Sequence, residues 1–429
     1  MSLLLKGGRI IDPVSKTDEV ADLLVKDGEI VAPGSLSPDS ECTELDLSGK
    51  MVFPGFIDMH VHLREPGRED KETIKTGSMA AVAGGFTGIA CMPNTDPVND
   101  CETVTRYILE KAEDAGKANV YPVGAVTKGL KGSELAEIGE MFKAGIVAVS
   151  DDGMPVQNNQ VMRRALEYVG IFDIPILDHC EDINLAAGGF MNESFVSTEL
   201  GLRGINSAAE ELQVARDAIL SRLTGSRVHI CHISAAESLE HVKRAKGEGI
   251  RITCEAAPHH FILTEENVRT FDPNFKMNPP LRSRKDVDAI LEGLVDGTVD
   301  CIATDHAPHL KMDKQETFDV SANGIIGLET SIPLVCDRLL HKGLITPLRM
   351  AELMSSNPAG ILGLERGSLA AGSVADITVI DPEMVATVDP EKFASKARNC
   401  PFAGWELKGW PVMTIVGGSV AWQSPAFQG

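Results

Sequence analysis

Eight short apolar runs recur between residues 51 and 310, and most of the stretches between them have the spacing of amphipathic helices. Strands that alternate with helices form parallel sheets, and eight such units predict an α/β fold, a closed (β/α)8 barrel of the TIM type. An open, doubly wound parallel sheet is the alternative. The runs are Met51 to Met59, Gly85 to Met92, Val120 to Val126, Gly145 to Ser150, Ile174 to Asp178, Arg227 to Cys231, Ile250 to Glu255 and Val299 to Thr304.

The stretches between the runs carry the signals that begin and end helices. Ser207 and Glu210 have the spacing of a capping box at a helix start. Glycines at 84–85 and 247–249 favour helix ends just before the next strand. The predicted helices are Glu72 to Gly84, Cys101 to Ala115, Gln160 to Tyr168, Ser207 to Leu223, Ala235 to Lys246 and Arg284 to Leu294.

The two ends of the chain have a different pattern, in which apolar and polar residues alternate as in half-buried strands. Residues 22–31 and 374–380 show it most clearly, and Asp27-Gly28 is a strong signal for a hairpin turn. Neither end has enough strands to bury a core alone. We therefore predict that residues 1–50 and 366–429 pair into one small β-sandwich domain, which flanks a barrel domain at residues 51–365.

Composition excludes several kinds of partner. The chain has 429 residues, of which 43% are hydrophobic and 24% charged, as in ordinary globular proteins. The formal net charge of -22 argues against nucleic acid and anionic membranes, because both attract clustered Lys and Arg. No apolar stretch approaches the roughly 20 residues of a membrane helix, and the first residues lack a signal-peptide pattern, so we expect a cytoplasmic protein.

The nine cysteines include no C-x-x-C pair, which predicts reduced thiols rather than disulfides or a thiolate metal site. Cys91, Cys231 and Cys301 lie in apolar runs, where we expect them to be small core residues.

Side chains that can bind a metal stand at the ends of four predicted strands. His60 and His62 are two residues apart, on one face of an extended strand, and His179, His232 and Asp305 close three later runs. The carboxyl ends of parallel strands meet at one mouth of a (β/α)8 barrel, so we expect these five side chains to converge there. Imidazole and carboxylate without thiolate suit zinc or manganese.

Five ligands exceed the needs of one tetrahedral ion, which favours two metals, one on the first histidine pair and one on the two later histidines. A metal pair needs a bridging ligand, and Asp151 and Asp152 supply carboxylates at the fourth strand end. The residues alone leave the choice between them open, because the register of that strand is unknown.

Nearly the whole chain resembles the amidohydrolase superfamily, and in detail the type I dihydroorotases, a bacterial class. The order of several specific motifs carries the resemblance. They are Asp58 to Gly67 (DMHVHLREPG), Met92 to Thr95 (MPNT), Ser150 to Gly153 (SDDG), His179 to Asp182 (HCED), Pro258 to His260 (PHH), Met277 to Arg282 (MNPPLR), Ala303 to His309 (ATDHAPH), Asn357 to Ala359 (NPA) and Gly367 to Leu369 (GSL).

The resemblance implies a metal-dependent, reversible hydrolysis of the cyclic amide of dihydroorotate to N-carbamoyl-aspartate, in pyrimidine biosynthesis. It implies one or two zinc ions, with two favoured, and Asp305 as the catalytic carboxylate. Related families bridge their metals with a carboxylated lysine, whereas type I members place an aspartate there, which matches Asp152. The implied metal ligands are His60, His62, Asp152, His179, His232 and Asp305.

The resemblance also implies how substrate is held. Arg64 can grip the substrate carboxylate bidentately, and family members complete this grip with Asn94 and His309. The full implied set of substrate-binding residues is His62, Arg64, Asn94, Asn278, His309, Asn323 and Gly324. Homodimers are common in the family, and some type I members associate with aspartate transcarbamoylase.

One segment departs from the family pattern. Members usually carry an aromatic residue before the glycine of the segment after strand eight, where this chain has Asn323 before Gly324. Backbone contacts can survive that change, but a side-chain contact at 323 is not the usual one. The preceding stretch, Leu310 to Val320, is rich in Lys, Asp and Glu and predicts a solvated, mobile loop over the site.

The remaining polar residues near the motifs favour structural roles. His229 is expected on the opposite face from His232, buried against a helix, and His241 and His341 at the surface. Asp178 and Glu181 are expected either beside the ligands or in solvent. Arg64 has an alternative as the ion-pair partner of Glu65 or Asp58. Second-layer or structural roles are favoured for His259, His260 and His306.

Two other functions compete with the leading one. A hydrolase of hydantoin or dihydropyrimidine rings would act on substrates without a carboxylate, which Arg64, Asn94 and His309 argue against. An inactive scaffold subunit is the other, because the family includes homologues that lost their ligands, whereas this chain retains them.

Overall fold

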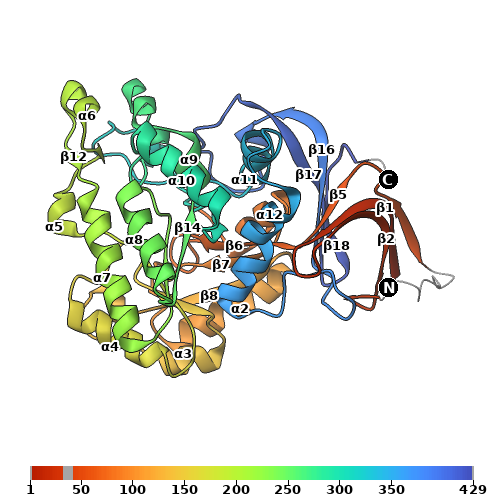
Figure 1. Ribbon diagram of the computed structural model, residues 1–429, viewed down its shortest axis with the longest axis horizontal. Coiled ribbons are helices and arrows are strands. Elements are labelled where there is room, and N and C mark those ends of the chain that lie inside the picture. Colours follow the sequence, from red (N-terminus) through yellow and green to blue (C-terminus); the bar gives the residue numbers. More distant parts are fainter. Residues whose placement is uncertain (1, 32–41, 428–429) are drawn as a thin grey trace.

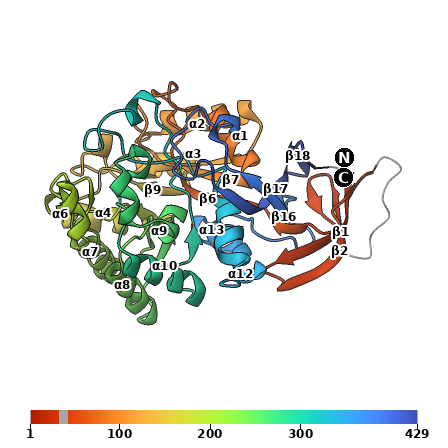
Figure 2. The ribbon, with the colours of Figure 1, turned by 90° about the horizontal axis from the view of Figure 1, so that it is seen from above.

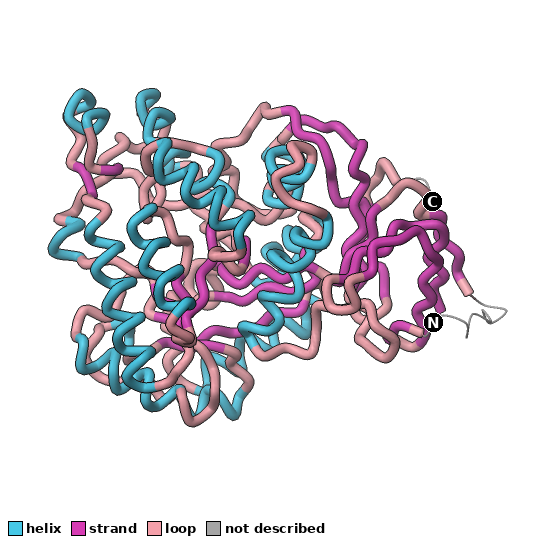
Figure 3. Tube along the Cα trace, in the orientation of Figure 1, coloured by secondary structure: helices cyan, strands magenta, loops and turns pink. Residues whose placement is uncertain are grey.

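The structure, a computed structural model, describes residues 2–31 and 42–427. Most strands gather in two places, inside a ring of helices and in a separate sheet where both ends of the chain lie (Figures 1 and 3). Residues 1, 32–41 and 428–429 of the predicted small domain lie outside the described residues.

Parallel strands form a nearly closed barrel, as predicted. They follow one another in sequence order around the sheet, which excludes the doubly wound alternative, whose order reverses. At the seam, His62 N donates to His306 O over 2.8 Å and so joins the first strand to the segment after the last. The barrel strands are β6 (Phe56–Val61), β7 (Phe86–Cys91), β8 (Asn119–Ala125), β9 (Ala148–Ser150), β10 (Ile176–Asp178), β13 (Val228–Ile230), β14 (Ile252–Ala256) and β15 (Cys301–Ile302).

Helices surround these strands (Figure 2). The six predicted helices are present within a few residues of their expected bounds, and α3 is an additional one. The main helices are α1 (Ile74–Ala83), α2 (Glu102–Ala115), α3 (Ile138–Ala144), α4 (Asn159–Val169), α7 (Ala208–Thr224), α8 (Ala236–Gly247) and α10 (Arg284–Asp296). Shorter ones are α5 (Ile183–Ala186), α6 (Phe195–Leu200), α9 (Pro258–Ile262), α11 (Ser331–Val335), α12 (Pro347–Ala351) and α13 (Asn357–Leu362), and β11 (Met191–Asn192) pairs with β12 (Gly204–Ile205).

The predicted capping box is wrong. Ser207 precedes α7 but makes no side-chain capping bond. Glu210 instead points to the next strand end, where its carboxylate accepts the N–H groups of Ser234 and Ala235 over 3.1 and 3.0 Å. Glu210 thus makes long-range hydrogen bonds to Ser234 and Ala235 in place of the predicted local bond at the helix start.

The core contains the cysteines that the sequence assigns to it. Cys231 and Cys301 pack with Ile57, Met59 and Leu177 in one buried cluster. All nine cysteines are unpaired. Within the described residues, no helix combines the length and apolar character needed to cross a membrane.

The first predicted strand, Met51 to Met59, is two strands rather than one. β5 (Met51–Pro54) pairs with strands from the chain ends, and β6 begins the barrel. Gly55 separates them, and a Cβ atom there would lie 2.1 Å from Thr87 Oγ1. The continuous apolar run hides this break because both strands are buried.

The chain ends pair with each other through β5. It lies between β1 and β16 in one eight-stranded sheet of order β18-β17-β16-β5-β1-β2-β3, with β4 beside β1. The predicted turn at Asp27-Gly28 joins β2 to β3, with φ of 51° and 88°. The division into domains at residues 51 and 366 stays a prediction. The strands are β1 (Ser2–Asp12), β2 (Thr17–Lys26), β3 (Glu29–Ile30), β4 (Thr43–Asp46), β16 (Ile377–Thr387), β17 (Glu406–Val416) and β18 (Ser419–Gln423).

Buried threonines join this end sheet to the barrel. Thr378 Oγ1 donates to Gly85 O over 2.7 Å and accepts from Phe56 N over 3.0 Å. Thr414 Oγ1 donates to Val82 O over 2.7 Å. The first barrel strands are therefore fixed from outside by the end sheet.

We expect Thr378→Val to lower the free energy of unfolding by about 1–3 kcal/mol, because it leaves buried backbone groups without partners. Urea denaturation measures the change, and Thr43→Val, at an exposed position of β4, is the control. An equal effect of the two substitutions would contradict the assigned role of Thr378.

Candidate metal centre

The candidate ligands come together at the carboxyl ends of the barrel strands. His60 lies near the end of β6, and His62, His179, His232 and Asp305 each follow a strand by one to three residues. The backbone is left-handed at two of them, with φ of 32° at His232 and 51° at Asp305. Such conformations cost energy in residues other than glycine and gather at functional sites.

Asp152 lies at the centre of the group. Its Oδ1 atom is 3.4 Å from His60 Nε2, 3.6 Å from His179 Nδ1 and 3.7 Å from His232 Nε2. Its Oδ2 atom is 3.5 Å from His62 Nε2. The two oxygens therefore face different imidazoles.

Asp305 closes the cluster on one side. Its Oδ1 atom is 3.2 Å from His62 Nε2 and 3.7 Å from His60 Nε2. On the other side, His179 Nδ1 lies 3.0 Å from His232 Nε2. His60, His62 and Asp305 thus offer three ligand atoms within 4.8 Å of one another.

Outer partners orient the first two imidazoles. His60 Nδ1 is 2.8 Å from Glu255 Oε1, and His62 Nδ1 is 2.9 Å from Asn94 Oδ1. An oxygen acceptor at Nδ1 favours the tautomer with its proton there, which leaves Nε2 free to bind a metal. Both Nε2 atoms point toward the centre of the cluster.

Charge and unsatisfied atoms show that the cluster suits a cation. His60 Nε2, His232 Nδ1 and Asp152 Oδ1 are buried without a hydrogen-bond partner. Burial lowers the pKa of His179, but the carboxylates of Asp152 and Glu181 outweigh it and raise that pKa to about 10. The surroundings therefore favour positive charge in a buried place, which a divalent ion between neutral imidazoles can provide.

The two neighbouring aspartates have different surroundings. Asp151 Oδ1 accepts the N–H groups of Val126 and Thr127 over 2.8 and 3.0 Å, and its other oxygen accepts the Thr127 hydroxyl. Asp151 thus holds the turn after β8, whereas Asp152 faces the histidines. The geometry supports Asp152 as the bridge.

A cavity of about 230 Å³ opens over the cluster. All residues predicted to bind substrate line it together with the candidate ligands, except His60, which lies behind the wall. The lining residues are His62, Arg64, Asn94, Asp152, Gly153, His179, His232, Asn278, Asp305, Ala307, His309, Asn323 and Gly324. The individual roles of these residues stay predictions.

Arg64 is held by the backbone rather than by a carboxylate of its own strand. Its Nε donates to Pro308 O over 3.3 Å. The alternative ion pair with Glu65 or Asp58 is not formed, since those carboxylates accept backbone N–H groups elsewhere. Burial lowers the pKa of Arg64 to about 10, so the guanidinium stays charged at neutral pH.

His309 is a neutral ring that lines the same pocket. Its Nε2 is 2.7 Å from Asn323 O, and its Nδ1 is 3.1 Å from Lys71 Nζ. Burial, together with the nearby cations Arg64 and Lys71, lowers the pKa of His309 to about 3. The contact at 323 is made by the backbone, so it does not need the usual aromatic side chain.

Sequence reasoning missed Glu255 and misplaced His229. Glu255 Oε2 is 3.1 Å from His229 Nε2, and His229 Nδ1 is 2.8 Å from Thr253 Oγ1. His229 is thus buried in a polar chain that leads to His60, not against a helix as predicted. The signal for Glu255 was a carboxylate at the end of the seventh apolar run, since candidate ligands stand at the ends of other runs.

Other residues beside the ligands are engaged by protein groups. Asp178 is buried and forms an ion pair with Arg216 at 2.9 Å, which excludes the solvated alternative. Glu181 is 3.2 Å from Asn278 Nδ2. His306 Nδ1 accepts from Gly327 N over 3.2 Å and so orients the segment after strand eight.

The remaining histidines are also accounted for by their surroundings. His260 is buried with Nε2 2.9 Å from Pro279 O, and His259 is buried beside it. His241 is partly exposed and pairs with Glu211 at 3.1 Å, and His341 is exposed.

The loop at 310–320 is anchored rather than solvated throughout. Phe318 is 4% exposed and packs with Met191 and Val268. Lys314 Nζ donates to Pro273 O and to Ala322 O, both over 2.8 Å. The many charged residues of this loop led to the prediction that it is solvated, so the contacts of Phe318 and Lys314 were not foreseen.

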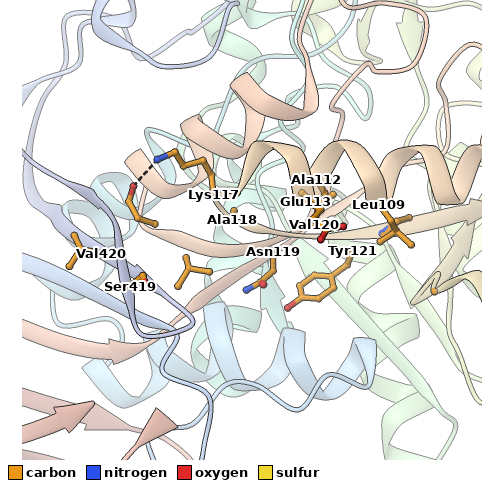
Figure 4. Close-up of a pocket in the computed structure, with 15 residues that line it drawn as sticks. Leu109, Ala112, Glu113, Lys117, Ala118, Asn119, Val120, Tyr121, Ser419 and Val420 are labelled. Atoms are coloured by element: carbon orange, nitrogen blue, oxygen red, sulfur yellow. Dashed lines mark hydrogen bonds between the residues drawn. The ribbon is translucent and has the colours of Figure 1, made fainter. Parts of the chain in front are cut away.

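A second, larger hollow of about 610 Å³ lies at the amino ends of the strands, away from the cluster (Figure 4). The end of α2, the start of β8 and strand β18 form its walls, and Lys117 Nζ reaches Ala421 O over 3.5 Å. None of the described residues that line it is a histidine or cysteine.

The fold and the histidine-carboxylate rim place the chain among the barrels of hydantoinase type. L-hydantoinase from Arthrobacter aurescens superposes with a TM-score of 0.87 and 26% identity, over 97% of this chain and 95% of that one. A family model described as Dihydro-orotase-like matches residues 49–238.

Relatives along the whole chain then define the family. Proteins named Dihydroorotase from Pelotomaculum thermopropionicum and Geobacter metallireducens are each 53% identical over 99% of this chain, and the matches cover 99% and 100% of them. The chain belongs to the dihydroorotase family.

We expect Asp152→Asn to weaken divalent-metal binding by more than about 100-fold, since it removes a charge at the centre of the cluster. Asp151→Asn should retain metal binding and lower the free energy of unfolding by about 1–3 kcal/mol. Metal titration and urea denaturation of both variants distinguish the two carboxylates. The opposite pattern would show that Asp151 is the ligand.

Proposed function

We propose that this protein catalyses the reversible hydrolysis of (S)-dihydroorotate to N-carbamoyl-L-aspartate, a step in the synthesis of pyrimidines. The observation that carries the proposal is a single pocket that contains both a cation-binding cluster and the guanidinium of Arg64. Such a pocket suits a ring amide that bears a carboxylate. The 53% identity to proteins named Dihydroorotase supports the same choice.

The cofactor that we propose is zinc, one or two ions per chain, with two favoured. His60, His62 and Asp305 would hold one ion, His179 and His232 the other, and Asp152 would join them. The support is that the two oxygens of Asp152 face different imidazoles. Zinc bound there supplies a Lewis acid for the ring carbonyl and lowers the pKa of water at the site.

Asp305 is the proposed proton carrier. Burial raises its pKa, but the hydrogen bond with His62 and the charge of His60 and His232 outweigh this, and the net pKa lies below its ordinary value. An ionised Asp305 on the pocket wall can accept a proton from the attacking water. It can then give that proton to the ring nitrogen as the C–N bond breaks, and ring closure follows the reverse path.

Recognition of the substrate carboxylate is assigned to Arg64, Asn94 and His309, which line the pocket beside the cluster. The ring is assigned to Asn278 and to the backbone at Asn323 and Gly324. The neutral His309 donates to Asn323 O, so it can fix the wall of the pocket without adding a second charge.

We also propose a cytoplasmic location, which the lack of a signal-peptide pattern and of a membrane-length apolar stretch supports. A homodimer and a complex with aspartate transcarbamoylase are proposed from the family resemblance alone. The mass of the protein in solution, alone and mixed with that partner, tests the two associations.

The test of the function is turnover of dihydroorotate against dihydrouracil, a ring of the same kind without the carboxylate, by the zinc-loaded protein. We expect dihydroorotate to be strongly preferred. Arg64→Gln should lower kcat/KM for dihydroorotate by about 100-fold, because a charged hydrogen bond to the carboxylate is lost.

The matched control is Arg68→Gln, four residues along the chain, where the guanidinium is exposed and pairs with Asp70. It should behave as the unmodified protein. Comparable turnover of both rings would reject dihydroorotase activity in favour of a hydantoinase-like one, and absence of turnover would favour an inactive scaffold.

Glu255→Gln tests the outer support of the metal centre. We expect zinc affinity to fall by about 10- to 100-fold, because Glu255 orients His60 and strengthens it as a ligand. Competition with a chelator measures this without reference to activity. The control, Glu134→Gln, changes an exposed carboxylate that pairs with Lys128. If the zinc affinity of the Glu255→Gln variant were unchanged, Glu255 would have no role in supporting the metal centre.

A further inference from the structure

A segment from the C-terminal part of the chain reaches the substrate pocket from behind. Residues 393–402 lie between β16 and β17 of the end sheet, yet their contacts are with the mouth of the barrel. We propose that Asn399 in this segment is a positioning residue, which sets the pocket wall that receives the substrate carboxylate. This inference rests on the proposed function.

Asn399 joins two stretches of that wall. Its Nδ2 donates to Ala307 O over 2.9 Å and to Gly324 O over 3.1 Å, and its Oδ1 accepts from His309 N over 3.3 Å. Its own carbonyl accepts from Ile326 N over 3.0 Å. Both amide protons and the amide oxygen are therefore used.

Three of these partners line the pocket, namely Ala307, His309 and Gly324, whereas Asn399 does not. Asn399 is 4% exposed and lies behind the wall. It therefore acts on substrate only through its partners.

The Asn399 clamp adds to other hydrogen bonds between the two stretches of the wall, among them the one from Gly327 N to His306 Nδ1 at 3.2 Å. His309 Nε2 meets Asn323 O over 2.7 Å, and Ala307 N donates to Ile325 O over 2.8 Å. The Asn399 amide donates to the carbonyls of Ala307 and Gly324 at once, which couples the positions of the two stretches. Asn399 positions the backbone that carries the His309 ring, because its Oδ1 accepts from His309 N.

The segment that carries Asn399 is anchored independently. The carboxylate of Glu329 accepts the N–H groups of Ala394 and Ser395 over 2.9 and 3.1 Å, and Ser395 Oγ also donates to Glu72 Oε2. Cys400 and Phe402 pack in an apolar cluster beside the barrel mouth. A change of the Asn399 side chain therefore leaves the segment in place.

The metal ligands are held by other means, at the ends of strands and by Glu255 and Asn94. Loss of the clamp should therefore affect substrate binding rather than the metal centre. This separation distinguishes a positioning role from a general structural one.

The test compares Asn399→Ala and the nearly isosteric Asn399→Asp, which keeps the acceptor and removes both donors. We expect the KM for dihydroorotate to rise about 10-fold or more. The kcat should stay within about threefold and the zinc content should be unchanged. Asn357→Ala is the control, because Asn357 Nδ2 also donates to a backbone carbonyl, Asp300 O at 2.8 Å, away from the pocket.

Each outcome bears on the inference. An unchanged KM in either folded variant overturns it, as does a parallel loss of kcat and zinc, which indicates a structural role. Failure of both variants to fold while Asn357→Ala folds also overturns it. An unmodified protein without dihydroorotate turnover refutes the proposed function, and the inference with it, whereas normal turnover with unaffected variants refutes the inference alone.

Discussion

The buried charge at the barrel mouth is the constraint on which the rest of this molecule depends. Asp152 lies within 3.7 Å of His60, His179 and His232, and its Oδ1 atom is buried without a hydrogen-bond partner. A carboxylate in such a place is costly unless a cation accompanies it. Parallel strands that end at one rim bring these residues, distant in sequence, close enough to surround such a cation.

Much of the surrounding structure serves to hold this group. Glu255 and Asn94 orient imidazoles from the outside, Thr253 and His229 support Glu255, and the end sheet fixes the first strand of the barrel. Both ends of the chain thus contribute to a site made of residues from its middle. The end sheet holds the amino ends of the first two barrel strands, whose carboxyl ends lead to the site.

The sequence allowed the barrel and the candidate ligands to be predicted for one physical reason. Each ligand closes an apolar run, and strand ends converge in a parallel barrel whatever the exact bounds of the strands. Contacts between side chains on segments far apart in sequence could not be predicted. The chain from His60 through Glu255 to His229, the clamp at Asn399 and the anchors of the 310–320 loop depend on contacts that no local pattern encodes. The break at Gly55 was hidden for a related reason, since burial on both sides erases the alternation that separates strands.

The central claim is that imidazoles and carboxylates from distant segments share a cation at this rim. Anomalous X-ray scattering at the zinc edge, from crystals of the zinc-loaded protein, tests it most directly. We expect two peaks, one on each side of Asp152, with His60, His62 and Asp305 around one and His179 and His232 around the other. Zinc bound elsewhere, with the rim empty, would contradict it.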